Sequence, residues 1–300
     1  MNNKILLTGS SGFLGGYILH FLENKNYEVI KVGRSSASDI NIDLSHNKLS
    51  KIDVEYVIHV AGKAHVIPKT EEEKNEFFKV NYIGTNNLLH GLNPTKLKSI
   101  IFISTVAVYG KEVGELIDEK SPLLGNTPYA LSKIKAEQSI IDFGITNNIK
   151  TVVLRLPLIT GKNPRGNLSA IIEAIKKGYY FRIGKGHAKK SIISAYDIAN
   201  LIPELFDLNG VYNLTDVSHP KISEIDTIIA KKYNKKIKSI PIFLIKVIAK
   251  IGDIFYFFPF NSLKYKKLTN DLTFSNKKLF NDIKYRPSNG LSYIVKNLNN

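Results

Sequence analysis

The chain contains no cysteine among its 300 residues. It therefore cannot hold a disulfide framework, a thiolate zinc site, an iron–sulfur cluster or a cysteine nucleophile. We predict no metal site. Proteins without cysteine fit a reducing compartment, so we expect a cytoplasmic protein.

The N-terminus lacks the apolar run of a signal peptide. Only Ile5, Leu6 and Leu7 are apolar in succession before Thr8 and Gly9 end the run. A signal peptide needs a longer hydrophobic segment, so this one is typical of a buried strand. The sequence also shows no internal repeat and no low-complexity linker.

Acidic residues are too few to balance the basic ones. The chain has 42 Lys and Arg against 26 Asp and Glu, a formal net charge of +16. The lysines are scattered rather than gathered on one element, which indicates a solvated surface first, phosphate-bearing small molecules second and nucleic acid last. We therefore expect no nucleic-acid partner.

Five short β-rich runs are separated by stretches long enough for crossover helices. Such near-continuous apolar strands are typical of a parallel sheet covered on both faces, and they predict a doubly wound, Rossmann-like α/β fold. The rhythm changes after Pro157, so we place a boundary near residue 160, followed by helices over 168–178 and 198–206. The runs are Ile5–Leu7, Glu28–Val32, Tyr56–Val60, Ser99–Ile103 and Thr151–Leu156.

A glycine-rich loop follows the first run and leads directly into a helical pattern. Its spacing is G-x-x-G-x-x-G over Gly9, Gly12 and Gly15. Glycines at such a turn let the backbone approach a pyrophosphate, whose charge is met by free N–H groups at the helix N-terminus. The loop therefore indicates dinucleotide binding.

No acidic residue follows the second strand, where a carboxylate would bind the ribose 2′-hydroxyl of NAD. Arg34 stands there instead. An arginine suits a 2′-phosphate, so Arg34 favours NADP over NAD, although an exposed arginine without a ligand is also common at such a position. Asp43 is either a contact to the adenine amino group or a turn-forming residue.

Tyr129 and Lys133 are four residues apart, on one face of a predicted helix that begins after Pro128. A tyrosine pKa near ~10 is too high for an efficient base at neutral pH, and a lysine one turn away would favour the phenolate. Thr105 supplies a hydroxyl just past the end of an interior strand, where ligands bind in open α/β sheets.

Together, the glycine loop, the hydroxyl and the Tyr-Lys pair resemble the extended short-chain dehydrogenase/reductase family, of the NAD-dependent epimerase/dehydratase type. The resemblance covers essentially the whole chain. Further matching segments are His59–Gly62, Val80–Thr85, Leu154–Pro157 and Tyr285–Pro287.

The resemblance implies two domains. Residues 1–160 would bind the dinucleotide, and residues 161–300 would form a smaller domain, mainly for a nucleotide-sugar, with parts of 190–215 returning to the first domain. It also implies that Tyr129 exchanges a proton with the sugar C4 oxygen, that Thr105 hydrogen-bonds this oxygen, and that Lys133 holds the nicotinamide ribose. The cofactor residues would be Gly9, Gly12, Phe13, Leu14, Gly15, Arg34, Asp43, Leu44, Ala61, Gly62, Tyr129, Lys133 and Pro157.

The substrate-binding residues implied by the resemblance are Thr105, Asn167, Leu168 and Lys190. Asn167 and Leu168 can equally be the start of a helix, and Lys190 stands near the point where the family usually has an arginine for the diphosphate. We expect a nucleotide-diphosphate sugar as substrate, with UDP-sugars favoured, and leave a homodimer open.

The expected activity is that of an NAD(P)-dependent nucleotide-sugar epimerase or 4-ketoreductase in surface polysaccharide biosynthesis. Family members that eliminate water carry two acids after the hydroxyl, whereas Val106 and Ala107 follow Thr105 here. We therefore expect no 4,6-dehydratase activity. A non-catalytic NAD(P)-binding sensor or scaffold is the alternative. For His59 and His65, packing or a rim position is preferred to a catalytic role.

Residues 240–260 form the most apolar segment, but three charges make it unsuitable as a membrane span. Its apolar residues recur at helical spacing, opposite the charges. We interpret it as an amphipathic helix that covers the second domain, in preference to one that lies on a membrane, and expect no membrane contact. The apolar residues are Leu244, Val247, Ile248, Ile251, Ile254 and Phe255; the charges are Lys246, Lys250 and Asp253.

Overall fold

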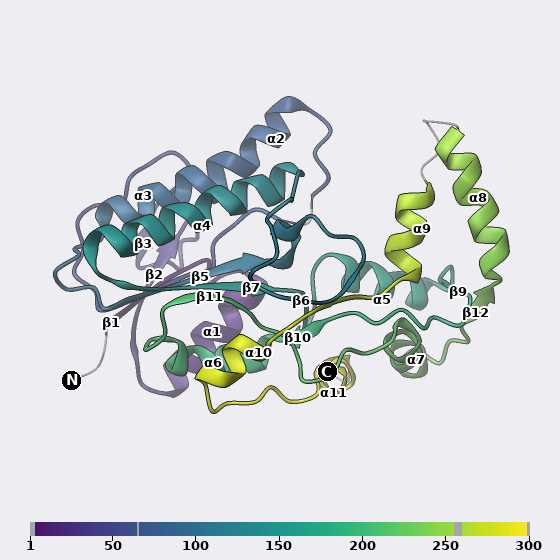
Figure 1. Cartoon of the computed structure of the whole chain (residues 1–300). Coiled ribbons are helices and arrows are strands. Elements are labelled where there is room, and N and C mark those ends of the chain that lie inside the picture. Colours follow the sequence, from purple (N-terminus) through teal and green to yellow (C-terminus); the bar gives the residue numbers. More distant parts are fainter. Residues whose placement is uncertain (1–3, 65, 255–259, 299–300) are drawn as a thin grey trace.

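The computed structural model describes residues 4–64, 66–254 and 260–298. Its centre is a seven-stranded parallel sheet in the order β11-β7-β5-β4-β1-β2-β3, which confirms the predicted Rossmann-like α/β fold (Figure 1). All five predicted strands are present. The sheet strands are β1 Lys4–Thr8, β2 Glu28–Gly33, β3 Ile40–Asn41, β4 Tyr56–His59, β5 Ser99–Thr105, β7 Lys150–Leu156 and β11 Gly210–Asn213.

Side chains of each central strand alternate between two cores, because successive residues of a strand point to opposite faces. In β1, Ile5 and Leu7 belong to one buried cluster and Leu6 to the other. Both faces are covered by helices, so the strands are apolar along their whole length rather than at every second residue.

Helices α1 Phe13–Asn24, α6 Ala195–Leu205 and α10 Lys277–Asp282 cover one face of the sheet. Helices α2 Glu71–Phe78, α3 Gly84–Gly91 and α4 Pro128–Asn147 cover the other, with a π-helical turn η1 Lys79–Ile83 between α2 and α3. The layers lie above and below the sheet in Figure 1. The helix predicted over 198–206 begins earlier, because the Ser194 side chain accepts a hydrogen bond from the Asp197 N–H and caps α6.

Beyond the carboxyl ends of the central strands, the second half of the chain forms smaller sheets and helices. The paired strands are β8 Leu158–Thr160 with β10 Ile192–Ser194, β9 Phe181–Ile183 with β12 Lys238–Ile240, and β6 Gly114–Ile117 with β13 Leu272–Phe274. A third apolar cluster lies among α5 Asn167–Lys177, α7 Ile222–Lys232 and α11 Gly290–Leu298.

Helix α8 Ile242–Ile254 and helix α9 Ser262–Thr269 lie at the outer end of this second half (Figure 1). The apolar residues predicted to cover the second domain are exposed along α8; only Ile245, Ala249 and Gly252 are buried. The predicted packing of this face is therefore wrong, because periodicity defines an apolar face without naming its neighbour. Phe255 lies outside the described residues.

Among the residues that the structure describes, no helix combines the length and the apolar character needed to cross a bilayer.

Candidate active site

The glycine loop brings the end of β1 and the start of α1 into contact closer than a side chain would permit. An ideal Cβ on Gly15 would lie 2.0 Å from the Gly9 carbonyl oxygen, and one on Gly9 would lie 2.7 Å from the Ala61 nitrogen. Gly9 also has φ +71°, in the left-handed region that favours glycine. The tight turn leaves the start of α1 open to a ligand.

The N-terminus of α1 has no side-chain cap and no acidic residue in its first turn. Ser11, Gly12 and Phe13 at this N-terminus line a cavity of about 490 Å³, which continues along α1 past Gly16 and Tyr17. The positive end of the helix dipole lies at this end of the helix. Lys162 and Arg165 line the same cavity from the loop after β8. Uncapped N–H groups, glycines and two cations fit the diphosphate of a dinucleotide.

Arg34 and Asp43 are brought together beside the end of β2. Their guanidinium nitrogen and carboxylate oxygen are 3.8 Å apart, and the Arg34 side chain is largely exposed. The Asp43 carboxylate accepts hydrogen bonds from the Ser45 N–H and hydroxyl at 3.0 and 2.6 Å, which lower its pKa, with further lowering by Arg34. Asp43 is thus a turn-forming residue here, and Leu44 follows it in the same turn.

The loop after β4 carries Ala61 and Gly62, and the buried Asn81 of η1 holds it in place. The Asn81 side chain accepts from the Lys63 N–H at 2.7 Å, donates to the Lys63 carbonyl at 3.0 Å, and donates to the Ser132 hydroxyl of α4 at 2.9 Å. Asn81 belongs to the matching segment Val80–Thr85, but the sequence alone assigns it no role. Its place within a π-helical turn, a feature frequent at functional sites, is visible only in the structure.

Thr105 and Tyr129 meet where β5 ends and α4 begins. Thr127 caps α4 by accepting from the Ala130 N–H, so Tyr129 lies in the first turn. Burial raises the pKa of Tyr129, and a hydrogen bond with the Thr105 side chain lowers it. The pKa of Tyr129 thus lies above its ordinary value. The lowering expected from Lys133 is not found in the protein by itself.

Lys133 is buried one turn further along α4, with a relative exposure of 4%. Its ammonium donates to the Ile103 carbonyl of β5 at 2.6 Å and lies 3.9 Å from the centroid of the Phe102 ring. Burial lowers its pKa to about 7, and the charge of Glu137 opposes this shift. The Lys133 ammonium is thus held by the main chain of β5.

A buried polar network supports this part of α4 from beneath. Glu137 accepts from Arg155 of β7, with an Nη2 to Oε2 distance of 2.7 Å, and from the Ser104 hydroxyl. Arg155 also donates to the Tyr109 hydroxyl at 3.1 Å, and that hydroxyl donates to the Asn213 side chain at 2.8 Å. The network joins the ends of β5, β7 and β11 to the helix that carries Tyr129 and Lys133.

The family model for the NAD dependent epimerase/dehydratase family matches residues 5–214. The chain belongs to this family. It is 27% identical over 241 residues to a UDP-glucose 4-epimerase of Vibrio cholerae, covering 74% of this chain and 68% of that protein.

A second relative is 25% identical over 262 residues, covering 80% of this chain and 75% of its own length: the N-acetyl-α-D-glucosaminyl-diphospho-ditrans,octacis-undecaprenol 4-epimerase of Escherichia coli O157:H7. Among solved structures, RMD from Pseudomonas aeruginosa, complexed with NADPH, is similar with a TM-score of 0.74 and 20% identity, covering 99% of this chain and 100% of that one.

Within this epimerase/dehydratase fold, His59 is a buried packing residue. Its two ring nitrogens lie 2.6 Å from the Thr8 hydroxyl and 2.9 Å from the Thr85 hydroxyl. Burial lowers the pKa of His59 to about 3, and the Lys133 charge adds to this, so the ring is neutral. This agrees with the preference for packing. His65 lies outside the described residues.

The remaining predicted site residues, one for the cofactor and three for the substrate, differ in exposure and in their contacts. Pro157 is half-buried between β7 and β8, and Asn167 is exposed at the start of α5. The Leu168 side chain is only 1% exposed and belongs to the third apolar cluster, and a substrate contact of this residue stays a prediction. The Lys190 ammonium donates to the Lys267 and Asn270 carbonyls at 2.8 and 2.9 Å.

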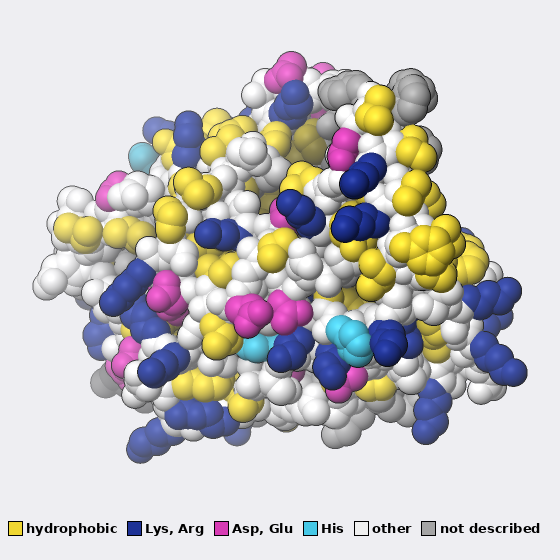
Figure 2. All heavy atoms as spheres, turned by 45° about the vertical axis from the view of Figure 1, so that its right-hand side comes forward, with side chains coloured by type: hydrophobic (Ala, Val, Ile, Leu, Met, Phe, Trp, Pro, Cys, Tyr) yellow, Lys and Arg dark blue, Asp and Glu magenta, His cyan; other side chains and the backbone are white. Residues whose placement is uncertain are grey.

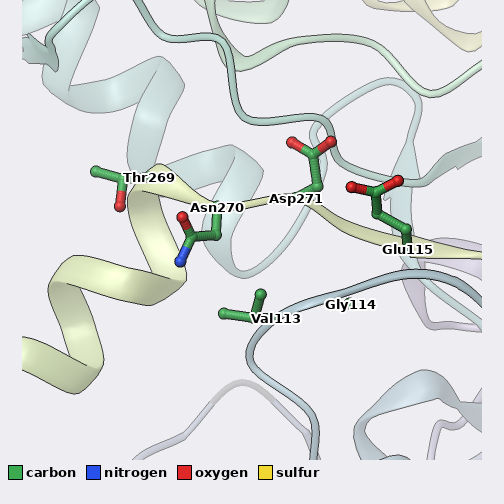
Figure 3. A pocket seen from close by; sticks show the side chains of 6 residues that line it. All are labelled: Val113, Gly114, Glu115, Thr269, Asn270 and Asp271. Carbon is green, nitrogen blue, oxygen red and sulfur yellow. The ribbon is translucent and has the colours of Figure 1, made fainter.

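A separate hollow of about 540 Å³ lies between the start of β6 and the segment that leads from the end of α9 to β13. Figure 3 shows its lining from close by: residues 113–115 on one side and residues 269–271 on the other. None of the predicted catalytic or cofactor residues lines this hollow.

Proposed function

We propose that this chain is a nicotinamide-dependent enzyme that acts at C4 of a nucleotide-diphosphate sugar, as a 4-epimerase or a 4-ketoreductase. The observation that carries the proposal is the meeting of Thr105 and Tyr129 at the end of β5, one helical turn before the buried Lys133. A protein that only binds a dinucleotide has no use for this set of groups.

The cofactor would be held by the glycine loop, by Ala61 and Gly62, and by Lys133. The nicotinamide, when bound, supplies the site that gives or accepts a hydride. Tyr129 would exchange a proton with the C4 oxygen of the sugar, and Thr105 would hydrogen-bond the same oxygen and orient it.

The Lys133 ammonium carries three N–H donors, and the Ile103 carbonyl accepts a hydrogen bond from one of them. A ribose hydroxyl is a suitable acceptor for another of them. Lys133 would then hold the ribose through its charge, while the buried Glu137 beneath it favours the charged form.

Several residues support finer points of the proposal. Arg34 favours NADP, because its guanidinium is largely exposed and its contact with Asp43 is long, at 3.8 Å, so it can reach a 2′-phosphate. Val106 and Ala107 stand after Thr105 in the turn η2 Val106–Tyr109. They offer no proton donor or base for an elimination, so we propose that the chain is not a 4,6-dehydratase.

The two relatives support a sugar diphosphate as substrate. One is named for UDP-glucose and the other for an N-acetylglucosaminyl diphosphate joined to undecaprenol. We propose UDP-sugars as the first substrates to test, in a pathway that builds surface polysaccharide.

The deciding experiment offers the purified protein a panel of UDP- and dTDP-sugars, with and without NADPH, and identifies the products. Loss of NADPH in proportion to an added 4-keto sugar nucleotide, without interconversion of the C4 epimers, identifies a ketoreductase. Interconversion without added cofactor identifies an epimerase. If no sugar of the panel gives either result although the protein binds cofactor, a non-catalytic sensor or scaffold describes the protein better.

The same assay with Tyr129→Phe tests the assigned proton donor. Losing one positioned acid–base group typically lowers the rate by on the order of 10²–10⁴, while the phenyl ring retains the packing. Tyr179→Phe, at an exposed tyrosine, is the matched control. Near-full activity of Tyr129→Phe would show that another group moves the proton.

A further inference from the structure

Helices α8 and α9 form a hairpin that projects from the second half of the molecule (Figure 1). At the far end of α8, the Asp253 carboxylate accepts from the Ser262 N–H at 3.0 Å and so joins the two helices. Asn261 caps α9 by accepting from the Lys264 N–H at 3.0 Å. The hairpin is thus a built element of the fold rather than an unstructured extension.

The side of α8 that points away from its packing partners is apolar and open. With about 100° between successive residues, Ile245, Ala249 and Gly252 share one side, and they are the buried residues of the helix. The opposite side, which we call the outer face, is exposed by 43% at Ile251 and by 76% at Ile254. The outer face consists of Phe243, Leu244, Val247, Ile251 and Ile254.

Figure 2 shows these hydrophobic side chains gathered at the right-hand edge of the molecule, over α8, with basic side chains beside them. Contiguous apolar surface of this kind on a folded protein indicates an interaction site.

Lysines border the outer face. Lys246 and Lys250 lie along one flank of α8. Helix α9 carries three more lysines, at 264, 266 and 267, of which Lys267 forms an ion pair with Glu112 at 2.9 Å. The acid of the two helices, Asp253, is engaged by Ser262. An apolar face bordered by lysines is the pattern of helices that lie in the headgroup region of anionic membranes.

We propose that the hairpin α8–α9 docks through the outer face on the surface of an anionic lipid bilayer. A helix of 13 residues is roughly 20 Å long, too short to cross a hydrocarbon core of about 30 Å, so it lies on the bilayer. The apolar side chains enter the boundary of the acyl chains, while Lys246 and Lys250 on the flank of α8 reach the lipid phosphates. The proposal does not depend on the reaction proposed above.

The hairpin is firmly attached to the part of the chain that follows the candidate active site. The Asp271 carbonyl accepts from the Gly114 N–H at 2.9 Å, and β13 pairs with β6, which follows η2 and Thr105 in sequence. The Lys190 ammonium holds the end of α9 through two carbonyls. Docking through the hairpin therefore fixes the position of the enzyme relative to the bilayer.

Co-sedimentation of the full-length protein with vesicles tests this docking. One set is phosphatidylcholine alone and the other contains about 30 mol % phosphatidylglycerol, because surface potential is set by the anionic lipid. We expect binding to the anionic vesicles at least tenfold tighter than to the neutral ones, and weaker binding at about 0.5 M NaCl.

Two double variants separate the apolar and the charged contributions. Val247→Asp with Ile251→Asp should abolish sedimentation, and Lys246→Gln with Lys250→Gln should weaken it by on the order of tenfold or more. Ile145→Asp is the matched control: this isoleucine of α4 is as exposed as Ile254 but lies outside the hairpin, and its variant should sediment like wild type. Circular dichroism melting checks that each variant is folded.

Absence of sedimentation by the wild type, or equal sedimentation of wild type and both double variants, overturns the proposal. So does a result in which the wild type is a dimer in gel filtration and Val247→Asp with Ile251→Asp is a monomer, with vesicle binding unchanged. In that case the outer face would be covered by a second copy of this chain.

Discussion

Replacing Lys133 by Met should stabilise the protein while it removes activity. The lysine is buried in the candidate active site, and its pKa is lowered from 10.5 to about 7. A lowered lysine pKa means that the folded protein holds the charged form at a free-energy cost. Met keeps most of the apolar stem and carries no charge.

The magnitude follows from the shift. One pKa unit corresponds to about 1.4 kcal/mol. The shift from 10.5 to about 7 therefore means that holding the charged lysine costs the folded protein about 5 kcal/mol well below pH 7. Losing the hydrogen bond to the Ile103 carbonyl offsets roughly 1–3 kcal/mol of this. We therefore expect Lys133→Met to raise the free energy of unfolding by about 2–4 kcal/mol near pH 6.

The sign of the pH dependence provides the sharper test. Between the folded pKa of about 7 and the unfolded value of 10.5, the unfolded chain binds more protons at this lysine, so wild-type stability rises with pH. The advantage of the variant should accordingly shrink by about 3 kcal/mol between pH 6 and pH 9.

Urea unfolding of both proteins at the two pH values, without cofactor, measures this difference. Lys135→Met, at an exposed lysine of the same helix, is the matched control and should show little change in either direction. A difference between wild type and Lys133→Met that is the same at both pH values would refute the reasoning, as would a variant less stable than wild type near pH 6.

Three further predictions concern one buried carboxyl of the second half and two cofactor-binding residues. Burial raises the pKa of Asp216 to about 7, so between pH 4 and 7 the folded protein binds one more proton there than the unfolded chain. Its stability therefore falls as the pH rises through this range. Asp216→Asn should remove this loss, which urea unfolding at pH 8 would measure as up to about 4 kcal/mol. Gly15→Ala should prevent formation of the glycine loop and abolish cofactor binding, because its Cβ would lie 2.0 Å from a carbonyl oxygen, whereas Gly16→Ala meets nothing closer than 3.8 Å and should be tolerated; equal cofactor affinities by calorimetry would contradict this. Arg34→Ala should weaken NADPH binding more than NADH binding, and equal losses for both cofactors would make Arg34 an ordinary surface residue.

The sequence was sufficient for the features that depend on local pattern. Five apolar runs became the central parallel strands, because strands covered on both faces are apolar throughout. Glycine spacing located the loop before α1, and a four-residue interval was enough to place Tyr129 and Lys133 on successive turns of one helix. These inferences hold because the reasons lie within a few residues of one another.

Other features depend on pairs of residues that are far apart in the chain. Strands β6 and β13 are short, and each is a strand only because the other, more than 150 residues away, pairs with it. The network that joins Glu137 to Arg155, Tyr109 and Asn213 has no local pattern either, since its members come from one helix, two strands and a turn.

Tertiary structure also decided which face of each helix is covered. The neighbours Asn167 and Leu168 were assigned alike, but one is exposed and the other is buried in the third cluster. In α8 the apolar periodicity predicts an amphipathic helix but not which side the protein covers: Leu244, Val247, Ile251 and Ile254, expected to pack on the second domain, belong to the outer face. A hydrophobic pattern specifies that a surface will leave water, and only the packed chain shows whether the protein itself or something else provides the cover.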